Sequence, residues 1–192
     1  TSISKNASTG TITTLSSINS SGITSFDANT MPVEAGTGIT GGTGTIYRSS
    51  VQRVGGIITT RILIDLTGLR STASGDIIGV NGTSNVCHIG QITAARNGTI
   101  LTGSMECFEA PAGGDPDINV HSATEGTGVE DGAISSLTET LLVNAGDATL
   151  GSKVYFSAVP AADEFLYLTL GDTTDADYTA GKLFIELMGY EA

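Results

Sequence analysis

The sequence has no tryptophan and is poor in several other kinds of side chain. Its 192 residues include 5 Tyr, 5 Phe and 4 Pro, and only 15% of them are charged, against roughly 25% in typical soluble domains. Apolar residues still make up 39% of the chain. A core built from this chain must therefore be aliphatic, and its surface must be completed by Thr, Ser, Asn and Gly.

Cysteine and histidine are too scarce for most catalytic or metal-binding sets. Cys87 and Cys107 are the two cysteines. The sequence leaves open whether they pair, and we interpret them as small buried hydrophobic residues. His88 directly follows Cys87, so in a strand their side chains point to opposite faces, which argues against a shared metal. His121 is the second histidine, and no G-x-S-x-G motif is present. We expect no catalytic, cofactor-binding or metal-binding residues and no enzymatic activity.

Basic side chains are also few. The chain carries 8 Lys and Arg against 20 Asp and Glu, a net charge of −12. This charge argues against binding to nucleic acids or to anionic membranes, whose phosphates attract Lys and Arg, and we expect neither as a partner. No apolar run is long enough for a transmembrane helix. Residues 1–96 hold 6 basic and 4 acidic side chains, whereas residues 97–192 hold 2 and 16. Either the second half merely has more solvated loops, or the nearly neutral half supplies contacts while the acidic half faces water.

Glycine and β-branched residues are abundant, and together they predict short strands joined by tight turns. The 26 glycines accompany many Thr, Val and Ile residues. Apolar and polar residues alternate in Ile57–Leu66, Lys153–Val159, Glu164–Leu170 and Leu183–Met188. In the first of these, one face is formed by Ile58, Thr60, Ile62, Ile64 and Leu66. Eight or nine such strands without a convincing helix predict an all-β fold, an antiparallel β-sandwich that is jelly-roll-like.

Two pairings between strands are also expected. Asn97-Gly98 is a strong turn signal, and it predicts a hairpin between Asn85–Thr93 and Thr99–Glu109. That hairpin would place the two cysteines in adjacent strands. The last two strands, Glu164–Leu170 and Leu183–Met188, are expected to form an antiparallel pair in the main sheet.

Residues 1–45 differ from the rest of the chain. They are polar, almost uncharged and rich in Gly, Ser and Thr, and their few apolar residues follow neither strand nor helix periodicity. Such a segment cannot bury enough apolar surface to offset the entropy of ordering it. It is either disordered or an extended arm that orders against something else. We divide the chain into an N-terminal arm, residues 1–45, and a β-sandwich domain, residues 46–192.

One acidic loop is the best candidate for a metal site. Asp172, Asp175 and Asp177 lie within six residues, and carboxylates of this density can gather around Ca²⁺. The spacing is not that of an EF-hand, and Asp is also an ordinary turn residue, so calcium binding stays open. Gly36–Gly44 is dense in glycine, but no Lys follows it, so it does not match a phosphate-binding loop.

From Asn97 onward the chain resembles structural proteins of tailed bacteriophages, particularly head decoration or cement proteins. The resemblance lies in NGTILTGSMECFEAPAGGDPDINVHSATEGTGVEDGAISSLTETLL, in FLYLTLGDTTDADYTAGKLFIELMGYE, and upstream in GDIIGV. These motifs belong to strands and loops and carry no chemistry. The resemblance covers about two-thirds of the chain, and residues 1–45 have no counterpart in it.

The resemblance implies a β-sandwich subunit on the outside of an icosahedral head. Its partners would be the major capsid protein and copies of itself, as dimers or trimers, after assembly in the host cytoplasm. We expect a capsid decoration protein that stabilises the shell through its arm and its subunit contacts. A phage tail, fibre or neck subunit is one alternative, and a carbohydrate-binding adhesin module is another.

Overall fold

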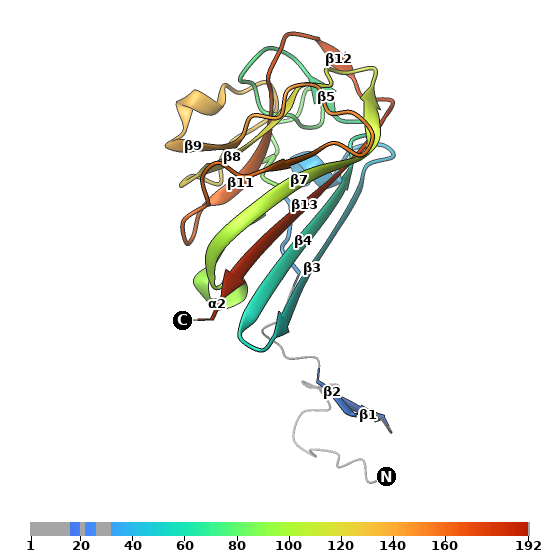
Figure 1. Ribbon diagram of the computed structural model, residues 1–192. Helices are drawn as coiled ribbons and strands as arrows, with labels where there is room; N and C mark the ends of the chain where they lie inside the picture. The colour runs from blue at the N-terminus through green and yellow to red at the C-terminus, as the bar shows by residue number, and fades with distance from the viewer. Residues whose placement is uncertain (1–15, 20–21, 26–31, 192) are drawn as a thin grey trace, which may run out of the picture.

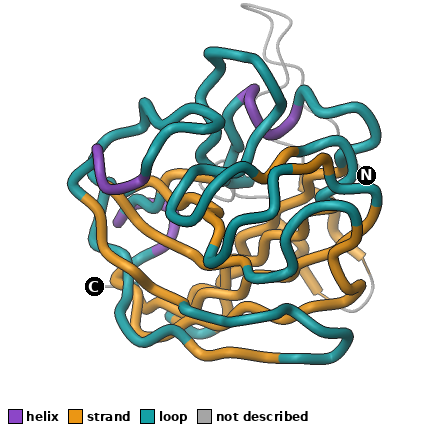
Figure 2. The backbone as a smooth tube through the Cα atoms, turned by 90° about the horizontal axis from the view of Figure 1, so that it is seen from above, coloured by secondary structure: helices purple, strands orange, loops and turns teal. Residues whose placement is uncertain are grey.

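The protein forms two antiparallel β-sheets that pack face to face (Figure 1). The structure is a computed structural model that describes residues 16–19, 22–25 and 32–191. Strands dominate it, and the connections at the end that carries β5 and β12 are long loops, drawn in teal in Figure 2. The predicted all-β sandwich is therefore confirmed. Within the described ranges, no helix is both long and apolar enough to span a membrane.

The two main sheets contain nine strands, in agreement with the expected eight or nine. The five-stranded sheet has the spatial order β10 (Lys153–Tyr155), β7 (Thr99–Ala112), β13 (Ala180–Tyr190), β4 (Ile57–Asp65) and β3 (Ile46–Val54). The four-stranded sheet has the order β6 (Gly90–Gln91), β11 (Phe165–Leu170), β8 (Ile118–Ala123) and β9 (Glu139–Val143). Two short pairs lie outside them, β1 (Ser16–Asn19) with β2 (Gly22–Ser25) and β5 (Arg70–Ser71) with β12 (Ala176–Asp177).

The strand order is that of a jelly roll. Without β3, the two sheets contain eight strands, and the first of these pairs with the last, the second with the seventh, the third with the sixth and the fourth with the fifth. The four pairs are β4·β13, β6·β11, β7·β10 and β8·β9, all antiparallel. This nested pairing wraps one long ribbon into two Greek keys, the arrangement found in many viral capsid and lectin domains.

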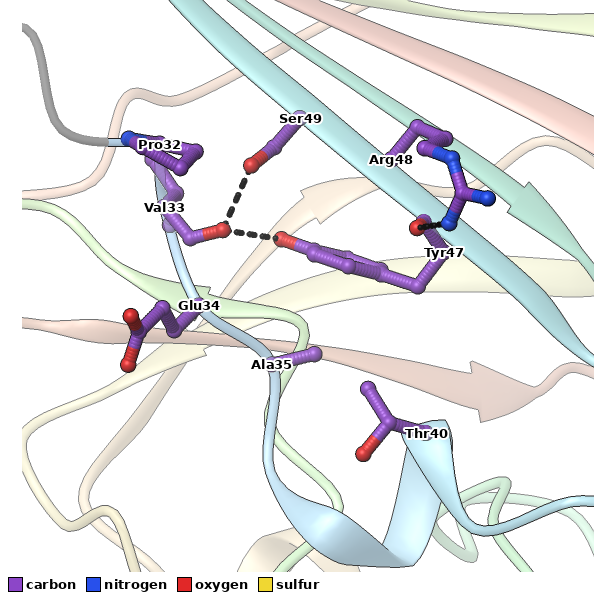
Figure 3. A pocket seen from close by; sticks show the side chains of 8 residues that line it. All are labelled: Pro32, Val33, Glu34, Ala35, Thr40, Tyr47, Arg48 and Ser49. Atoms are coloured by element: carbon purple, nitrogen blue, oxygen red, sulfur yellow. Dashed lines mark hydrogen bonds between the residues drawn. The ribbon is translucent and has the colours of Figure 1, made fainter.

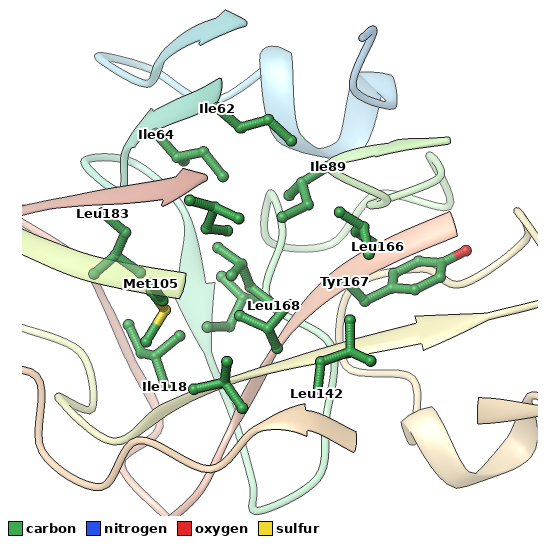
Figure 4. Close-up of a cluster of buried hydrophobic side chains, with 14 of the residues drawn as sticks. Ile62, Ile64, Ile89, Met105, Ile118, Leu142, Leu166, Tyr167, Leu168 and Leu183 are labelled. Carbon is green, nitrogen blue, oxygen red and sulfur yellow. The ribbon is translucent and has the colours of Figure 1, made fainter. Parts of the chain in front are cut away.

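The core lies between the sheets and is aliphatic, as the composition predicts. The alternating faces expected for β4 and β13 are confirmed: Ile58, Thr60, Ile62 and Ile64 are buried, as are Leu183, Ile185 and Leu187. In Figure 4 the side chains of both sheets point into one shared space. Cys87 and Cys107 are buried there as free thiols, so they behave as small apolar residues and do not pair.

The outer surfaces of the two sheets differ. The outer face of β11 is covered by residues 125–137, because the Tyr167 hydroxyl donates to the Glu125 carbonyl at 2.7 Å and accepts from the Gly128 amide at 3.2 Å. Tyr167 and Thr169 are consequently buried although they point away from the five-stranded sheet. No comparable loop covers the outer face of the five-stranded sheet among the described residues, and that face is open to solvent (Figure 1).

Both predicted strand pairings are wrong. Asn97-Gly98 does not join a hairpin, because residues 94–97 form the one-turn helix α2 (Ala94–Asn97) and Gly98 ends it with φ 68°. The Asn97 amide is buried and donates to Thr60 Oγ1 at 2.8 Å, so this residue closes the end of the core. Only Gly90–Gln91 of the predicted strand 85–93 is a strand, and it pairs with β11. The last two long strands, β11 and β13, lie in different sheets.

Residues 32–45 belong to the β domain, which corrects the predicted arm boundary at residue 45. Val33 and Ile39 are almost fully buried, and Ile39 is part of the main core cluster. The segment contains the one-turn helix α1 (Thr37–Thr40), and a third short helix, η1, spans Ile134–Ser136, whereas no helix was expected. Gly38 is required for this packing, because a Cβ there would lie 2.4 Å from Cys87 Sγ. The rest of the predicted arm, apart from β1 and β2, lies outside the described residues.

Candidate assembly surface

Among the described residues, the outer side of the five-stranded sheet is a surface of regular strands that no loop covers. We call it the open face and define it by the side chains of five strands that point away from the core. In 46–54, 57–65 and 182–190 it comprises every second residue, counted from Ile46, Ile57 and Lys182. It also includes Thr102, Ser104, Glu106, Phe108 and Glu109 of β7 and Lys153 and Tyr155 of β10.

Exposed apolar side chains are concentrated on the open face. Of the 11 large hydrophobic residues that are exposed among the described residues, seven lie on it. These seven are Ile46, Val54, Ile57, Phe108, Tyr155, Met188 and Tyr190. Single exposed apolar residues are normal on soluble proteins, but their grouping on one surface is typical of an interaction site.

Two β-bulges in β7 expose apolar side chains, and the first of these side chains lies on the open face. A register shift between the pairs of Lys182 and Leu183 inserts Phe108 as an extra residue of β7. Its ring stacks on Phe184 with centroids 5.2 Å apart and planes 8° apart. A second shift near Met188 leaves Leu101 exposed, although its spacing from Met105 and Cys107 predicts that all three share the core face. Bulges re-aim side chains in this way, and alternation alone could not reveal them.

Charge on the open face is balanced, in contrast with the rest of the protein. Residues 32–191 contain 7 basic and 19 acidic side chains. The open face has four of each, Arg48, Arg61, Lys153 and Lys182 with Asp65, Glu106, Glu109 and Glu186, which leaves 3 basic and 15 acidic side chains elsewhere. The face is neutral, and the whole charge of −12 falls on the remaining surface.

Most charges of the open face are also paired across strands. Arg61 lies 2.8 Å from Glu186, Lys153 lies 3.5 Å from Glu106, and Lys182 contacts both Glu109 and Asp65. The pKa of the Asp65 carboxyl is lowered by its hydrogen bonds from Thr67 and by the Lys182 charge, which outweigh the effect of burial. Exposed pairs of this kind add little stability. They do ensure that a partner covering the face buries few isolated charges.

The second part of the surface is the place where the chain enters the domain, beside β3. In Figure 3 the Val33 carbonyl oxygen faces two side chains of β3, the Tyr47 hydroxyl at 3.0 Å and the Ser49 hydroxyl at 2.5 Å. The Tyr47 hydroxyl also lies 2.8 Å from the Ile89 carbonyl oxygen, so its proton serves two segments. Burial raises the pKa of Tyr47 far above its usual range, so the hydroxyl remains a donor. This contact fixes residues 32–35 against the sandwich.

Replacing Tyr47 by phenylalanine should loosen this entry point. The Tyr47→Phe variant keeps the ring but removes a donor from two carbonyl oxygens, which typically costs about 1–3 kcal/mol when the acceptors are buried. We expect a lower urea midpoint and faster cleavage near residue 32 in limited proteolysis. Tyr155→Phe is the matched control, because that ring lies exposed on the open face. Equal midpoints for the two variants would contradict the anchoring role.

The three carboxylates of the candidate calcium loop are not gathered around a cation site. Asp175 and Asp177 both bind Arg70, at 2.7 and 2.9 Å. Asp172 lies near Asp117 instead, and its charge contributes to raising the pKa of that carboxyl, of which burial is the main cause. In the part of the chain that the structure describes, no three His, Cys, Asp or Glu side chains are placed to hold a metal ion.

The histidines and cysteines are likewise kept apart. His88 packs against the Phe165 ring at 5.0 Å, and burial lowers its pKa. His121 lies in β8, where its Nδ1 is 2.7 Å from Glu139. Burial raises the pKa of Cys87 to about 12, which makes this thiol a poor nucleophile. The glycine-dense segment 36–44 packs α1 onto residues 85–87 and forms part of the core.

Comparisons with known proteins add no relative to this description. A scan against protein-family models, a search of curated proteins and a search of solved structures each found no match.

Proposed function

We propose that the protein is a virion structural subunit, a decoration or cement protein that binds the outside of a phage head and stabilises the shell. The open face is the observation that carries this proposal: one neutral, partly apolar sheet surface on an otherwise strongly acidic protein. The sequence resemblance from Asn97 onward and the jelly-roll fold, which is frequent among viral capsid proteins, point the same way. Fold analogy alone is a weak argument for function, so the proposal depends on the surface.

The charge distribution indicates how such a subunit would sit on a shell. A protein of net charge −12 repels copies of itself at most orientations. The open face is the orientation with the least repulsion, because its charges cancel and its apolar residues gain from burial. Docking by this face turns the acidic remainder to solvent. Both halves of the chain contribute to the open face. The predicted contrast between a contacting first half and a solvated second half therefore becomes a contrast between the neutral open face and the acidic remainder of the surface.

The N-terminal segment supplies a second means of attachment in this proposal. It enters the domain at Pro32, on the core side of the edge strand β3. Residues 1–31 precede Pro32. A fully extended segment of that length would span about 100–110 Å, and the β1–β2 hairpin, which folds part of it back, shortens this reach. An arm of this reach can contact the shell or a neighbouring subunit well beyond the domain's own footprint.

Substituting Phe108 on the open face should reduce particle binding. Phe108→Asp places a charge beside Phe184 without entering the core, since Phe108 is about half exposed. We expect at least about a tenfold weaker association with empty heads of the virus that encodes the chain, equivalent to about 1.4 kcal/mol. Binding is measured by co-sedimentation of the purified protein with the heads.

Leu141→Asp is the matched control, because Leu141 is 39% exposed and lies in β9 of the four-stranded sheet, away from the open face. It introduces the same charge and should leave binding unchanged. Equal loss in both variants would indicate a general charge effect, and no loss in either would remove the open face from the attachment mechanism. Circular dichroism confirms that both variants are folded.

The alternative virion positions differ in stoichiometry. A decoration protein should be present in a copy number comparable with that of the major shell protein, whereas a tail, fibre or neck subunit should be present in far fewer copies. Quantitative mass spectrometry of purified particles separates them. A carbohydrate-binding module is favoured by one observation, the exposed rings of Phe108 and Tyr155 on the open face. Clear hits on a glycan array would support that function.

A further inference from the structure

Strand β3 is an open edge of the five-stranded sheet. It is nine residues long and pairs with β4 along its whole length without a register shift. It contains no proline. The other edge strands of the two main sheets are shorter: β10 has three residues, β6 has two and β9 has five. Long, regular edges invite pairing with another chain, and soluble proteins usually interrupt or cover them.

The turn that joins β3 to β4 determines which peptide groups point outward. Gly55 and Gly56 form a two-residue turn with positive φ angles of 59° and 84°, so Val54 and Ile57 close the hairpin as a hydrogen-bonded pair. Because such pairs alternate along antiparallel strands, the peptide groups of Tyr47, Ser49, Val51 and Arg53 point away from β4.

These outward groups are nearly all free in the part of the chain that the structure describes. Their one partner is the Arg48 guanidinium, which donates to the Tyr47 carbonyl oxygen at 2.8 Å. Four amides and three carbonyls remain available for a further strand. The segment at Val33 does not use them, because it is held by the side chains of Tyr47 and Ser49 on the core side of β3 (Figure 3).

We propose that this edge pairs with β3 of a second copy, antiparallel and about a twofold axis. The two five-stranded sheets then join into one continuous sheet, and their open faces become adjacent. The pairing is isologous, so it satisfies both edges at once and closes at two copies. Strands β1 and β2 are weaker candidates, because each has four residues and would cover less than half of β3.

The side chains along the edge are compatible with this pairing. No carboxylate occurs between Ile46 and Ile64, so the seam brings no acidic groups together although the protein carries a charge of −12. Arg48 is the charged side chain that covers part of the edge, and it must release the Tyr47 carbonyl when the partner strand docks. This dimer is the self-association that the proposed function includes. Dimerisation can be measured without shell protein, so a protein that stays monomeric in solution would contradict the dimer and not the binding to heads.

Amide hydrogen exchange of the full chain, followed by NMR at several protein concentrations, tests the proposal. The amides of Arg48, Ser50 and Gln52 are bonded to β4 and serve as internal controls, since they should exchange slowly at every concentration. The amides of Tyr47, Ser49, Val51 and Arg53 should exchange rapidly in dilute solution. They should slow by about tenfold at the concentration where nine-tenths of the protein sediments as a dimer, because exchange then requires dissociation.

Each other outcome overturns the proposal. Rapid exchange of the outward amides at all concentrations would mean that the edge stays open. Slow exchange in a monomer would mean that another part of the same chain covers it. An Ile23→Pro variant interrupts the β1–β2 hairpin, and Ile3→Pro is its control outside both strands. Loss of the concentration-dependent protection in Ile23→Pro alone would assign the edge to the hairpin of the second copy instead of its β3.

Discussion

Deleting residues 1–45 should destabilise the β domain far more than deleting residues 1–31. The longer deletion removes Val33 and Ile39, which are 1% and 0% exposed. Burying an aliphatic side chain of this size contributes about 1.5–3 kcal/mol, so the two deletions should differ by about 3–6 kcal/mol in the free energy of unfolding. That difference approaches the whole stability of many domains. Thermal melting followed by circular dichroism should show a cooperative transition for the shorter deletion and little or none for the longer one.

The same pair of deletions separates the role of residues 32–45 in domain stability from the role of residues 1–31 in binding to the phage head. In the proposed function, the protein without residues 1–31 folds but binds phage heads poorly, because it has lost the arm and kept the entry contact at Tyr47. Undiminished binding by this variant would remove the arm from the mechanism and leave the open face as the attachment site. Equal melting temperatures for the two deletions would contradict the assignment of residues 32–45 to the core.

Replacing Ile185 by alanine should cost about 3–4 kcal/mol of stability, within the range for aliphatic truncations in a close-packed core. Ile185 is fully buried in the central strand of the five-stranded sheet, where it lies between Ile62 of β4 and Met105 of β7. The cavity would open where both neighbouring strands are fixed by their own pairing, so the surroundings cannot collapse into it. Urea unfolding followed by fluorescence of the tyrosines measures the change.

Met188→Ala provides the comparison for that variant. Met188 lies on the same strand but points to the open face and is 40% exposed, so its truncation should cost about 1 kcal/mol or less. A similar loss in the two variants would mean that strand β13 is stabilised mainly by its backbone pairing. A loss below about 1 kcal/mol for Ile185→Ala would contradict a rigid core at this position.

The sequence predicted the interior of the sandwich better than its connections. Alternation is a property of a few neighbouring residues, so Ile62 and Ile185 could be assigned to the core from their own strands. Which strands pair depends on contacts far apart in the chain, and a two-residue period carries no information about them. The pair Asn97-Gly98 illustrates the limit, because the same two residues suit a hairpin turn and the end of a one-turn helix.

The candidate surface could be predicted only in part. The low charge and the uneven distribution of acidic residues indicated that some surface is spared from charge. Its location required the fold, since Lys153, Lys182 and Arg61 come onto one face only when β10, β13 and β4 share a sheet. The outward position of Phe108 also depends on a bulge. Residues 32–45 were assigned to the arm because Val33 and Ile39 stand among polar residues and follow neither strand nor helix periodicity. Both side chains are buried by partners from elsewhere in the chain, which a local pattern does not reveal.

The position of β13 in the middle of its sheet has a consequence during synthesis. Strands β4 and β7, its two neighbours, are made first, and the 78 residues 113–190 must follow before β13 is complete. At ordinary translation rates this takes about 4–16 s. Until β13 is complete, β4 and β7 each lack the neighbouring strand that they have in the folded sheet. Polysomes hold many such nascent chains close together, so they are where β4 or β7 of one chain is most prone to pair with a strand of another. A chaperone that keeps β4 and β7 apart until residue 190 emerges would prevent this mispairing.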